Sequence, residues 1–197
     1  MFTKGELRQN LLGSLEIALF MRKGVGRFAS SARAMKKSFL IPALALPLTL
    51  LMVFAAHPHA DISGGTMNIL IAIYSLRLVI YLAAFLGLAY VVAKKMDKLK
   101  SFYQFATANN WLMLPAIVLT IIPVAGMTAG YYSWADIQPL IIMTTFYSAA
   151  CTAFMITHVM RVPWELAGFA AITGLAIHQT SLDMIKWAAV NTVHLIS

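Results

Sequence analysis

Residues 67–93 read MNILIAIYSLRLVIYLAAFLGLAYVVA, and this stretch decides the class of fold. It carries a single charged side chain, Arg77. A spanning helix needs about 20 predominantly apolar residues, so this stretch can cross a bilayer with room to tilt or protrude. The whole chain agrees, because 60% of its 197 residues are hydrophobic and only 11% are charged. Soluble domains are about a quarter charged, so the sequence predicts an integral membrane protein.

Four more apolar segments flank this one, at 39–56, 102–122, 137–159 and 164–186. Together they predict an all-α fold, a polytopic membrane helical bundle of about five transmembrane helices with an amphipathic interfacial helix at the N-terminus. The segment 102–122 is the least regular of them, since Pro115 lies in its middle. The last segment is expected to continue as an extended or bent helix. We therefore divide the chain into a basic segment, 1–37, and a five-helix transmembrane domain, 38–197.

The basic residues predict how the chain is threaded. Eight lysines and arginines precede residue 39, four lie at 94–100, and Arg161 lies in the last connection. The connections 57–66 and 123–136 have none. Short cytoplasmic loops carry the excess of lysine and arginine, so we expect the N-terminus in the cytoplasm and the C-terminus outside. Clustered positive charge also suits anionic lipids better than nucleic acid, and no nucleic-acid partner is expected.

The N-terminal residues 6–24 predict an amphipathic helix that ends at Gly24 and Gly26. Its apolar residues recur three or four positions apart and form one face: Leu7, Leu11, Leu15, Ala18 and Leu19. A second basic piece with similar spacing follows at 27–39. Such helices lie in the headgroup region with apolar faces toward the acyl chains and basic side chains toward phosphates. The alternative is that both pieces pack against the bundle's own cytoplasmic face, and the two interpretations are compatible.

Arg77 is the main candidate for a functional residue inside the membrane. A charge near the middle of a span costs at least about 2.5–3.5 kcal/mol on insertion scales. Tyr74 and Tyr81 lie three residues before and four residues after it, so all three share one helix face. Arg77 is then either an anion-binding or gating residue, or a clamp that donates to carbonyls and hydroxyls of a neighbouring helix. We expect the two tyrosines and segment 137–159 to be its partners.

Asn109 and Asn110 are the other polar candidates within an apolar segment. They could line a solute path, hydrogen-bond across helices, or lie at the interface beside Trp111. Segment 137–159 is rich in small and hydroxyl residues, a composition that lets helices pack closely. Its Cys151 is the only cysteine, and nothing near it in the sequence would activate it as a nucleophile.

The stretch HPHAD, residues 57–61, has two interpretations. His57, His59 and Asp61 are side chains of the type that bind zinc or copper. A metal site usually needs four ligands, however, and this stretch supplies three. A polar turn between two spans explains the same residues, with Pro58 and Gly64 turning the chain. We favour the plain turn and expect no metal.

Known catalytic and cofactor-binding motifs are missing from the sequence. It contains no glycine-rich phosphate loop, no H-E-x-x-H motif and no nucleophile elbow. We therefore expect no enzymatic activity and no cofactor.

Two stretches resemble the Yip1-like membrane proteins. The sequence ANNWLMLPAIVLTIIP at 108–123 is similar to that family's alanine-rich segment with a mid-helix Leu-Pro, and RFASSARAMKKSFLIPALALP at 27–47 resembles the basic entry to its first helix. The resemblance implies five spans, a cytoplasmic N-terminal region and, for the bacterial members, the inner membrane. It implies a non-enzymatic membrane-organising or adaptor role with an unidentified protein partner, and it brings no catalytic residues. The alternative function is a small-solute or ion permease with Arg77 near its pathway.

Overall fold

A computed structural model describes residues 2–56 and 64–196 of the chain, and every regular element in these ranges is a helix. The predicted all-helical class is therefore confirmed. In chain order the elements are α1 (Lys4–Ala18), the 3₁₀ helix η1 (Arg22–Arg27), α2 (Ala32–Ser38), α3 (Leu40–Ala56), α4 (Gly64–Lys95), α5 (Leu99–Thr128), α6 (Trp134–Met160) and α7 (Trp164–Ile196).

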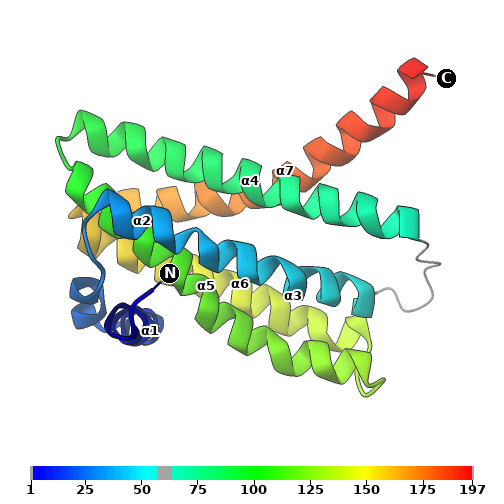
Figure 1. Cartoon of the computed structure of the whole chain (residues 1–197), viewed down its shortest axis with the longest axis horizontal. Coiled ribbons are helices and arrows are strands. Elements are labelled where there is room, and N and C mark those ends of the chain that lie inside the picture. Colours follow the sequence, from blue (N-terminus) through cyan, green and yellow to red (C-terminus); the bar gives the residue numbers. More distant parts are fainter. Residues whose placement is uncertain (1, 57–63, 197) are drawn as a thin grey trace.

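The long helices run along one common direction, and α1 crosses them at one end of the bundle (Figure 1). In this view α1 is seen nearly end-on, while α3 to α7 extend across the picture. Helix α5 lies at the centre, because it packs against α1, α2, α3, α4 and α6. The connections at 96–98 and 161–163 lie at the same end as α1 (Figure 1).

Four stretches of the described residues are long and apolar enough to cross a membrane, and they lie at Ala32–Leu51, Met67–Lys95, Leu99–Thr128 and Trp134–Met160. The first begins in α2, seven residues earlier than the predicted 39–56. Helix α7 is not among the four, although it does continue as one helix to Ile196. Its middle carries the polar run His178–Ser181, which lowers its hydropathy. A fifth span therefore stays a prediction.

The segment that contains Pro115 forms one continuous helix. Both Pro115 and Pro123 lie inside α5. A proline removes one backbone donor and normally strains a helix interior, but transmembrane helices tolerate it where neighbours satisfy the freed groups. The irregularity in the sequence therefore does not interrupt the helix.

Helix α1 ends at Ala18, six residues before the predicted end at Gly24. Phe20 has a φ of 55°, in the left-handed region that bulky residues rarely adopt. Its ring packs edge-on against Tyr147 and Phe154 of α6. Here a tertiary contact outweighs local helix preference, and the chain turns back so that η1 packs on α1.

Candidate functional site

Helix α1 is docked through a face made of small and polar residues. Asn10, Gly13, Ser14 and Ile17 are buried on this side. A methyl group on Gly13 would come within 2.8 Å of the Phe28 ring, so the contact requires glycine. At the far end of α1, the hydroxyl of Tyr147 donates to the carbonyl of Ala18. The face that packs against the protein is therefore not the predicted apolar face.

The predicted apolar face of α1 is largely exposed instead. Leu7, Leu11, Leu15 and Leu19 are between 37% and 66% exposed, whereas Ala18 is buried. We call these four residues the leucine stripe. Lys4 and Arg8 lie on the same side by helical spacing, and the described residues give neither an ion-pair partner. Packing therefore leaves an apolar and basic surface open.

The turn between α1 and η1 is held by one ion pair. Arg27 donates from Nε and Nη2 to the two carboxylate oxygens of Glu16, both at 2.6 Å. Lys23 adds a longer contact to the same carboxylate, at 3.6 Å. The hydrogen bond from Arg27 lowers the pKa of the Glu16 carboxyl below its usual range. Gln104 of α5 donates to the carbonyl of Val25 at 2.8 Å and ties η1 to the bundle.

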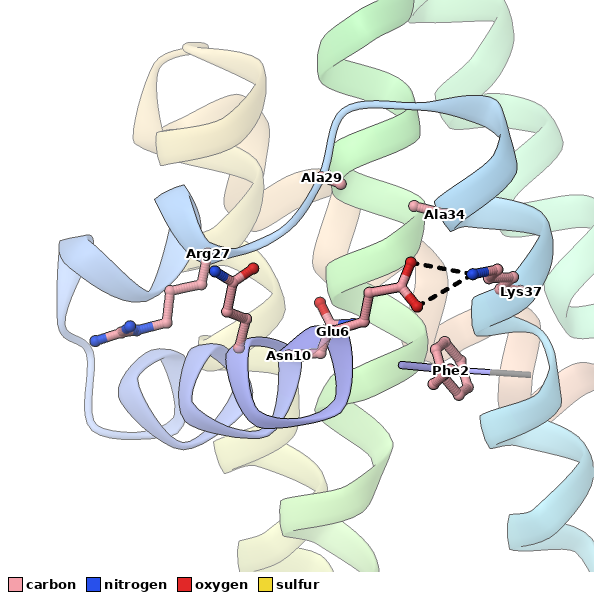
Figure 2. A pocket seen from close by; sticks show the side chains of 8 residues that line it. Phe2, Glu6, Asn10, Arg27, Ala29, Ala34 and Lys37 are labelled. Atoms are coloured by element: carbon pink, nitrogen blue, oxygen red, sulfur yellow. Dashed lines mark hydrogen bonds and ion pairs between the residues drawn. The ribbon is translucent and has the colours of Figure 1, made fainter. Parts of the chain in front are cut away.

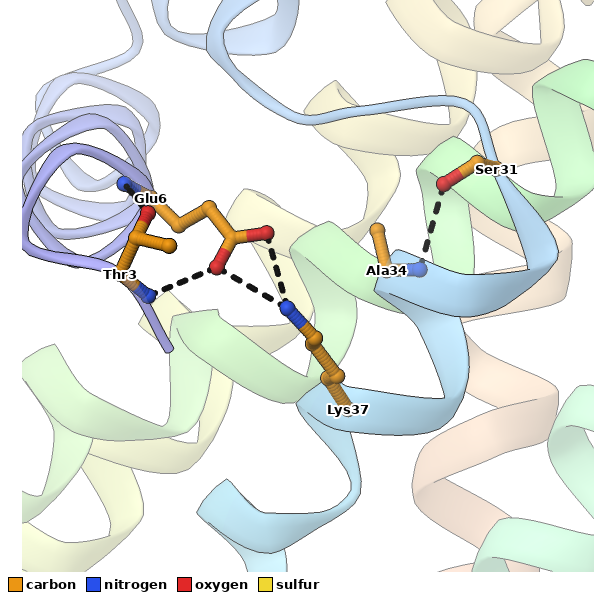
Figure 3. Close-up of polar contacts among 5 residues, drawn as sticks. All are labelled: Thr3, Glu6, Ser31, Ala34 and Lys37. Atoms are coloured by element: carbon orange, nitrogen blue, oxygen red, sulfur yellow. Dashed lines mark hydrogen bonds and ion pairs between the residues drawn. The ribbon is translucent and has the colours of Figure 1, made fainter. Parts of the chain in front are cut away.

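A second ion pair joins α1 to α2 (Figure 3). Lys37 Nζ lies 3.0 and 3.1 Å from the two oxygens of Glu6, and the backbone N–H of Thr3 donates to Glu6 at 2.8 Å. The Thr3 backbone bond, followed by that from Lys37, lowers the pKa of the Glu6 carboxyl. Thr3 and Glu6 also form a capping box, which satisfies two free donors at the start of α1. Ser31 caps α2 in the same region by accepting from the Ala34 N–H.

A small pocket lies between these pieces (Figure 2). The residues that line it come from α1, η1, α2 and the residues next to them: Phe2, Glu6, Gln9, Asn10, Arg27, Ala29, Ala34 and Lys37. Asn10 is only 9% exposed, and no described residue forms a hydrogen bond with its side chain. Sequence reasoning missed this pocket, because its lining residues are scattered over 36 positions and form no local motif.

Asn109 and Asn110 are both buried, and Asn110 hydrogen-bonds across helices. Its Nδ2 donates to Ser38 Oγ at 2.9 Å, and Ser38 in turn donates to the Met35 carbonyl at 2.7 Å. Both Asn110 and Ser38 are fully buried. Within the described residues, Asn110 Oδ1 and Trp111 Nε1 have no hydrogen-bond partner. Of the three predicted roles for this pair, the geometry of Asn110 matches the interhelical bond.

Arg77 contacts α7 rather than segment 137–159, so the predicted partner was wrong. Its Nε and Nη2 donate to the His178 carbonyl at 3.3 and 3.1 Å. The physical reason is that α4 packs along α7, and not along α6. Ser181 Oγ donates to the same carbonyl at 2.9 Å. Arg77 stays half-buried, and no carboxylate of the described residues lies within ion-pair distance.

The two predicted tyrosines have different surroundings. Tyr81 packs edge-on against the His178 ring, with centroids 5.1 Å apart, and stacks on Phe85. Tyr74 is half-buried, and no hydrogen bond joins it to Arg77 in the described part of the chain. The structure thus gathers Arg77, Tyr81 and His178 but leaves Tyr74 at the edge of this group. The polar run at 178–181, inside an otherwise apolar segment, was the signal that could have identified His178.

The basic connections gather at the end of the bundle where α1 lies. Lys98 Nζ donates to the carbonyl of Met160 at 3.0 Å, which joins the α4–α5 connection to the end of α6. Thirteen of the fifteen lysines and arginines belong to this end, namely all except Arg77 and Lys186. We call it the basic end.

The HPHAD stretch contains the three metal ligands considered in the sequence. His57, His59 and Asp61 lie outside the described residues. Among the residues that are described, no group of three or more histidine, cysteine, aspartate or glutamate side chains could hold a metal ion. Cys151 is buried in the core.

These features define a helical bundle with four stretches able to cross a membrane, consistent with an integral membrane protein. Comparisons with protein-family models, with curated protein sequences and with solved structures found no match to this chain. The sites described above therefore rest on the chain's own geometry.

Proposed function

We propose that the chain is a non-enzymatic integral membrane protein of the Yip1-like type, which organises the membrane or binds a protein partner at its basic end. One observation carries this proposal: α1 docks through its small polar face and leaves the leucine stripe exposed beside Lys4 and Arg8. On a surface that faces water, these four exposed leucines would add no stability to the fold. An amphipathic helix in the headgroup region buries the stripe in lipid and pairs its basic side chains with anionic phosphates.

The crosswise position of α1 supports this proposal. A helix that lies across a bundle of spanning helices runs parallel to the membrane plane. Phe2 packs on Trp111 with ring centroids 5.1 Å apart, and Tyr147 contacts Ala18, so both ends of α1 lie against spanning helices. From Trp111 to Thr128, α5 rises about 26 Å at 1.5 Å per residue, close to a hydrocarbon thickness of about 30 Å. The level of α1 thus suits a membrane boundary.

The depth of the leucine stripe tests this proposal. A spin label at Leu15→Cys should be shielded from water-soluble quenchers in vesicles that contain phosphatidylglycerol. A label at Gly26→Cys, where η1 borders open space, should remain accessible and serves as the matched control. Cys151 is buried and should not be labelled. Equal accessibility at both positions would contradict the proposed lipid contact.

The full topology of the proposal has five spans, a cytoplasmic N-terminus and an external C-terminus in a bacterial inner membrane. A reporter active only outside the cytoplasm should be active when fused after Ser197 and silent when fused after Lys98. The reason is the basic end, which the positive-inside rule assigns to the cytoplasm. Activity after Lys98 would contradict this orientation. A silent fusion after Ser197 would contradict the prediction of a fifth span.

A permease is the second candidate, favoured by one observation. Arg77 lies half-buried in an apolar stretch with no carboxylate in ion-pair distance among the described residues, as a residue beside an anion pathway would. Arg77→Ala separates the two functions. A permease should lose flux of a small anion in reconstituted vesicles while it still folds, whereas an adaptor should show no flux before or after the change.

A further inference from the structure

We propose that Asn110 and Trp111 of α5 hold one buried water molecule where α5 meets α2 and the start of α1. Both side chains are fully buried. Among the described residues, Oδ1 of the Asn110 amide and Nε1 of the Trp111 indole have no hydrogen-bond partner. Buried polar groups nearly always have a partner, in the protein or in a bound water, because an unsatisfied group loses its hydrogen bonds to bulk water.

The hydrogen bond to Ser38 fixes the orientation of the Asn110 amide. A serine hydroxyl has one hydrogen, and Ser38 donates it to the Met35 carbonyl at 2.7 Å. Ser38 Oγ must therefore accept in its bond with Asn110, so the amide nitrogen Nδ2 faces it, at 2.9 Å. The amide oxygen Oδ1 consequently needs a donor other than Ser38.

Two sets of contacts lead from these side chains to the same ion pair. Asn110 bonds to Ser38, which follows Lys37 at the end of α2, and Lys37 Nζ lies 3.0 and 3.1 Å from the carboxylate oxygens of Glu6. The Glu6–Lys37 pair therefore lies close to the Asn110 side of the junction.

The second set begins at Trp111. Its ring packs against the Phe2 ring with centroids 5.1 Å apart, and the next residue, Thr3, donates from its backbone N–H to Glu6 at 2.8 Å. Figure 2 shows Phe2 beside Glu6 and Lys37, and all three line the pocket described above. The contacts form a closed ring, so the two unpartnered atoms belong to one junction, and one small ligand there can serve both.

The chemistry of the two atoms selects water. Asn110 Oδ1 needs a donor, whereas Trp111 Nε1 needs an acceptor. A cation would suit only the amide oxygen, and an anion would suit only the indole N–H. A neutral group that both donates and accepts satisfies the two atoms, and a site between fully buried side chains favours the smallest such group. Phe2 is half-buried and also lines the pocket, which gives water a route to this junction.

The test uses NMR of the full-length protein in detergent micelles, with isotope-labelled tryptophan. The chain has four tryptophans, and Trp111→Phe identifies the indole N–H signal of Trp111. We expect a direct cross-peak between this N–H and water, with the sign of a long-lived contact. Absence of the cross-peak in the unmutated protein would overturn the inference. An indole that donates to the Phe2 ring instead gives that absence, and its signal then shifts in Phe2→Leu.

Asn110→Leu keeps the approximate volume of the side chain and removes Oδ1, so the cross-peak between Trp111 and water should be lost. Ser38→Ala is the matched control, because it also loses the bond between Asn110 and Ser38 but keeps Oδ1. It also removes a hydroxyl that could relay magnetisation from bulk water. The cross-peak should persist in Ser38→Ala. An unchanged cross-peak in Asn110→Leu, or its loss in Ser38→Ala, would contradict a water shared with Asn110.

A second measurement keeps the inference testable if Asn110→Leu does not fold. With isotope-labelled asparagine, the side-chain amide protons of Asn110 should show their own cross-peak to water, both in the unmutated protein and in Ser38→Ala. No contact between this amide and water would overturn the inference. The result is independent of the spin-label depth at Leu15, so a missing water and a failed lipid contact of α1 are distinguished.

Discussion

The middle of α5 consists of two halves with different surroundings, Phe105–Leu112 and Leu114–Ile122. From Phe105 to Leu112 every residue is buried, because α1, α2 and the long helices α3, α4 and α6 pack against α5. From Leu114 to Ile122 no residue is buried, and Ile122 is 74% exposed. Both halves are apolar enough to belong to one candidate span. The first half is therefore covered by protein, whereas the second half is left exposed and would be covered by lipid in a membrane; beyond it Pro123, Val124, Gly126 and Met127 are buried again.

Among the substitutions that test this difference, Trp111→Ala should lower the free energy of unfolding the most. Trp111 is fully buried and packs against Phe2, so its removal leaves a cavity that should cost about 3–5 kcal/mol. The free energy of unfolding is measured in detergent micelles. Ile122→Ala in the other half should cost under about 1 kcal/mol, because detergent covers the site either way. Equal losses at the two positions would show that the halves are not differently stabilised.

Asn110→Ala should have a smaller effect in the same buried half. It removes the bond to Ser38 and leaves the Ser38 hydroxyl with only its bond to Met35, so we expect a loss of about 1–3 kcal/mol. A double-mutant cycle with Ser38→Ala isolates the pair. A coupling energy near zero would mean that the bond contributes nothing to the packing of α2 on α5.

Arg77→Met should change stability by no more than about 1 kcal/mol, since hydrogen bonds between membrane helices are typically worth about that much. The change loses two bonds to the His178 carbonyl but also removes a charge that, among the described residues, has no carboxylate within ion-pair distance. A loss above about 3 kcal/mol would show that Arg77 has a stronger partner than this carbonyl, and would make the polar group on α4 as important as the buried half of α5.

The ion pair of Glu16 with Arg27 should make the docking of η1 sensitive to acid. Arg27 lowers the pKa of Glu16 in the folded state, so the pair stabilises the fold above the unfolded pKa of about 4.3. This contribution is lost as the pH falls through the lower folded pKa. Hydrogen exchange of residues 22–27 should therefore quicken below about pH 4, and Glu16→Gln should remove that dependence. An unchanged pH profile in the variant would contradict this assignment.

The sequence predicts well where the helices lie along the chain, but it predicts poorly which faces and which helices pack together. Hydropathy identifies spans because a bilayer needs about 20 apolar residues, and the helices α3 to α7 match the five predicted segments closely. The leucine spacing identified α1 but not which face would dock, because three residues of the docking face, Asn10, Gly13 and Ser14, are not apolar, and Ile17 alone adds a large apolar side chain. Close approach there depends on small size rather than on hydropathy.

The candidate sites depended even more on tertiary contacts. Arg77 was found because a charge in an apolar run is conspicuous, yet its partner lies 101 residues away and could not be chosen from the sequence. Asn110 stands out in a similar way, as a polar residue in an apolar run. Its partner Ser38 lies in a basic stretch, where a serine is not conspicuous. The pocket at Asn10 exists only once α1, η1 and α2 meet. No spacing in the sequence predicts where those three elements meet.

The contact between Tyr147 and Ala18 also has a consequence for the order of biogenesis, because 129 residues separate its two partners. At roughly 5–20 residues per second, a ribosome needs on the order of 6–26 s to make that length of chain. During this interval α1 has left the ribosome and its docking surface on α6 has not yet been made. The capping box of Thr3 and Glu6 satisfies two free donors at the start of α1 and so favours its helical state during this interval. The first helix to be synthesised can therefore pack on α5 first, and it completes its docking only when α6 has been made.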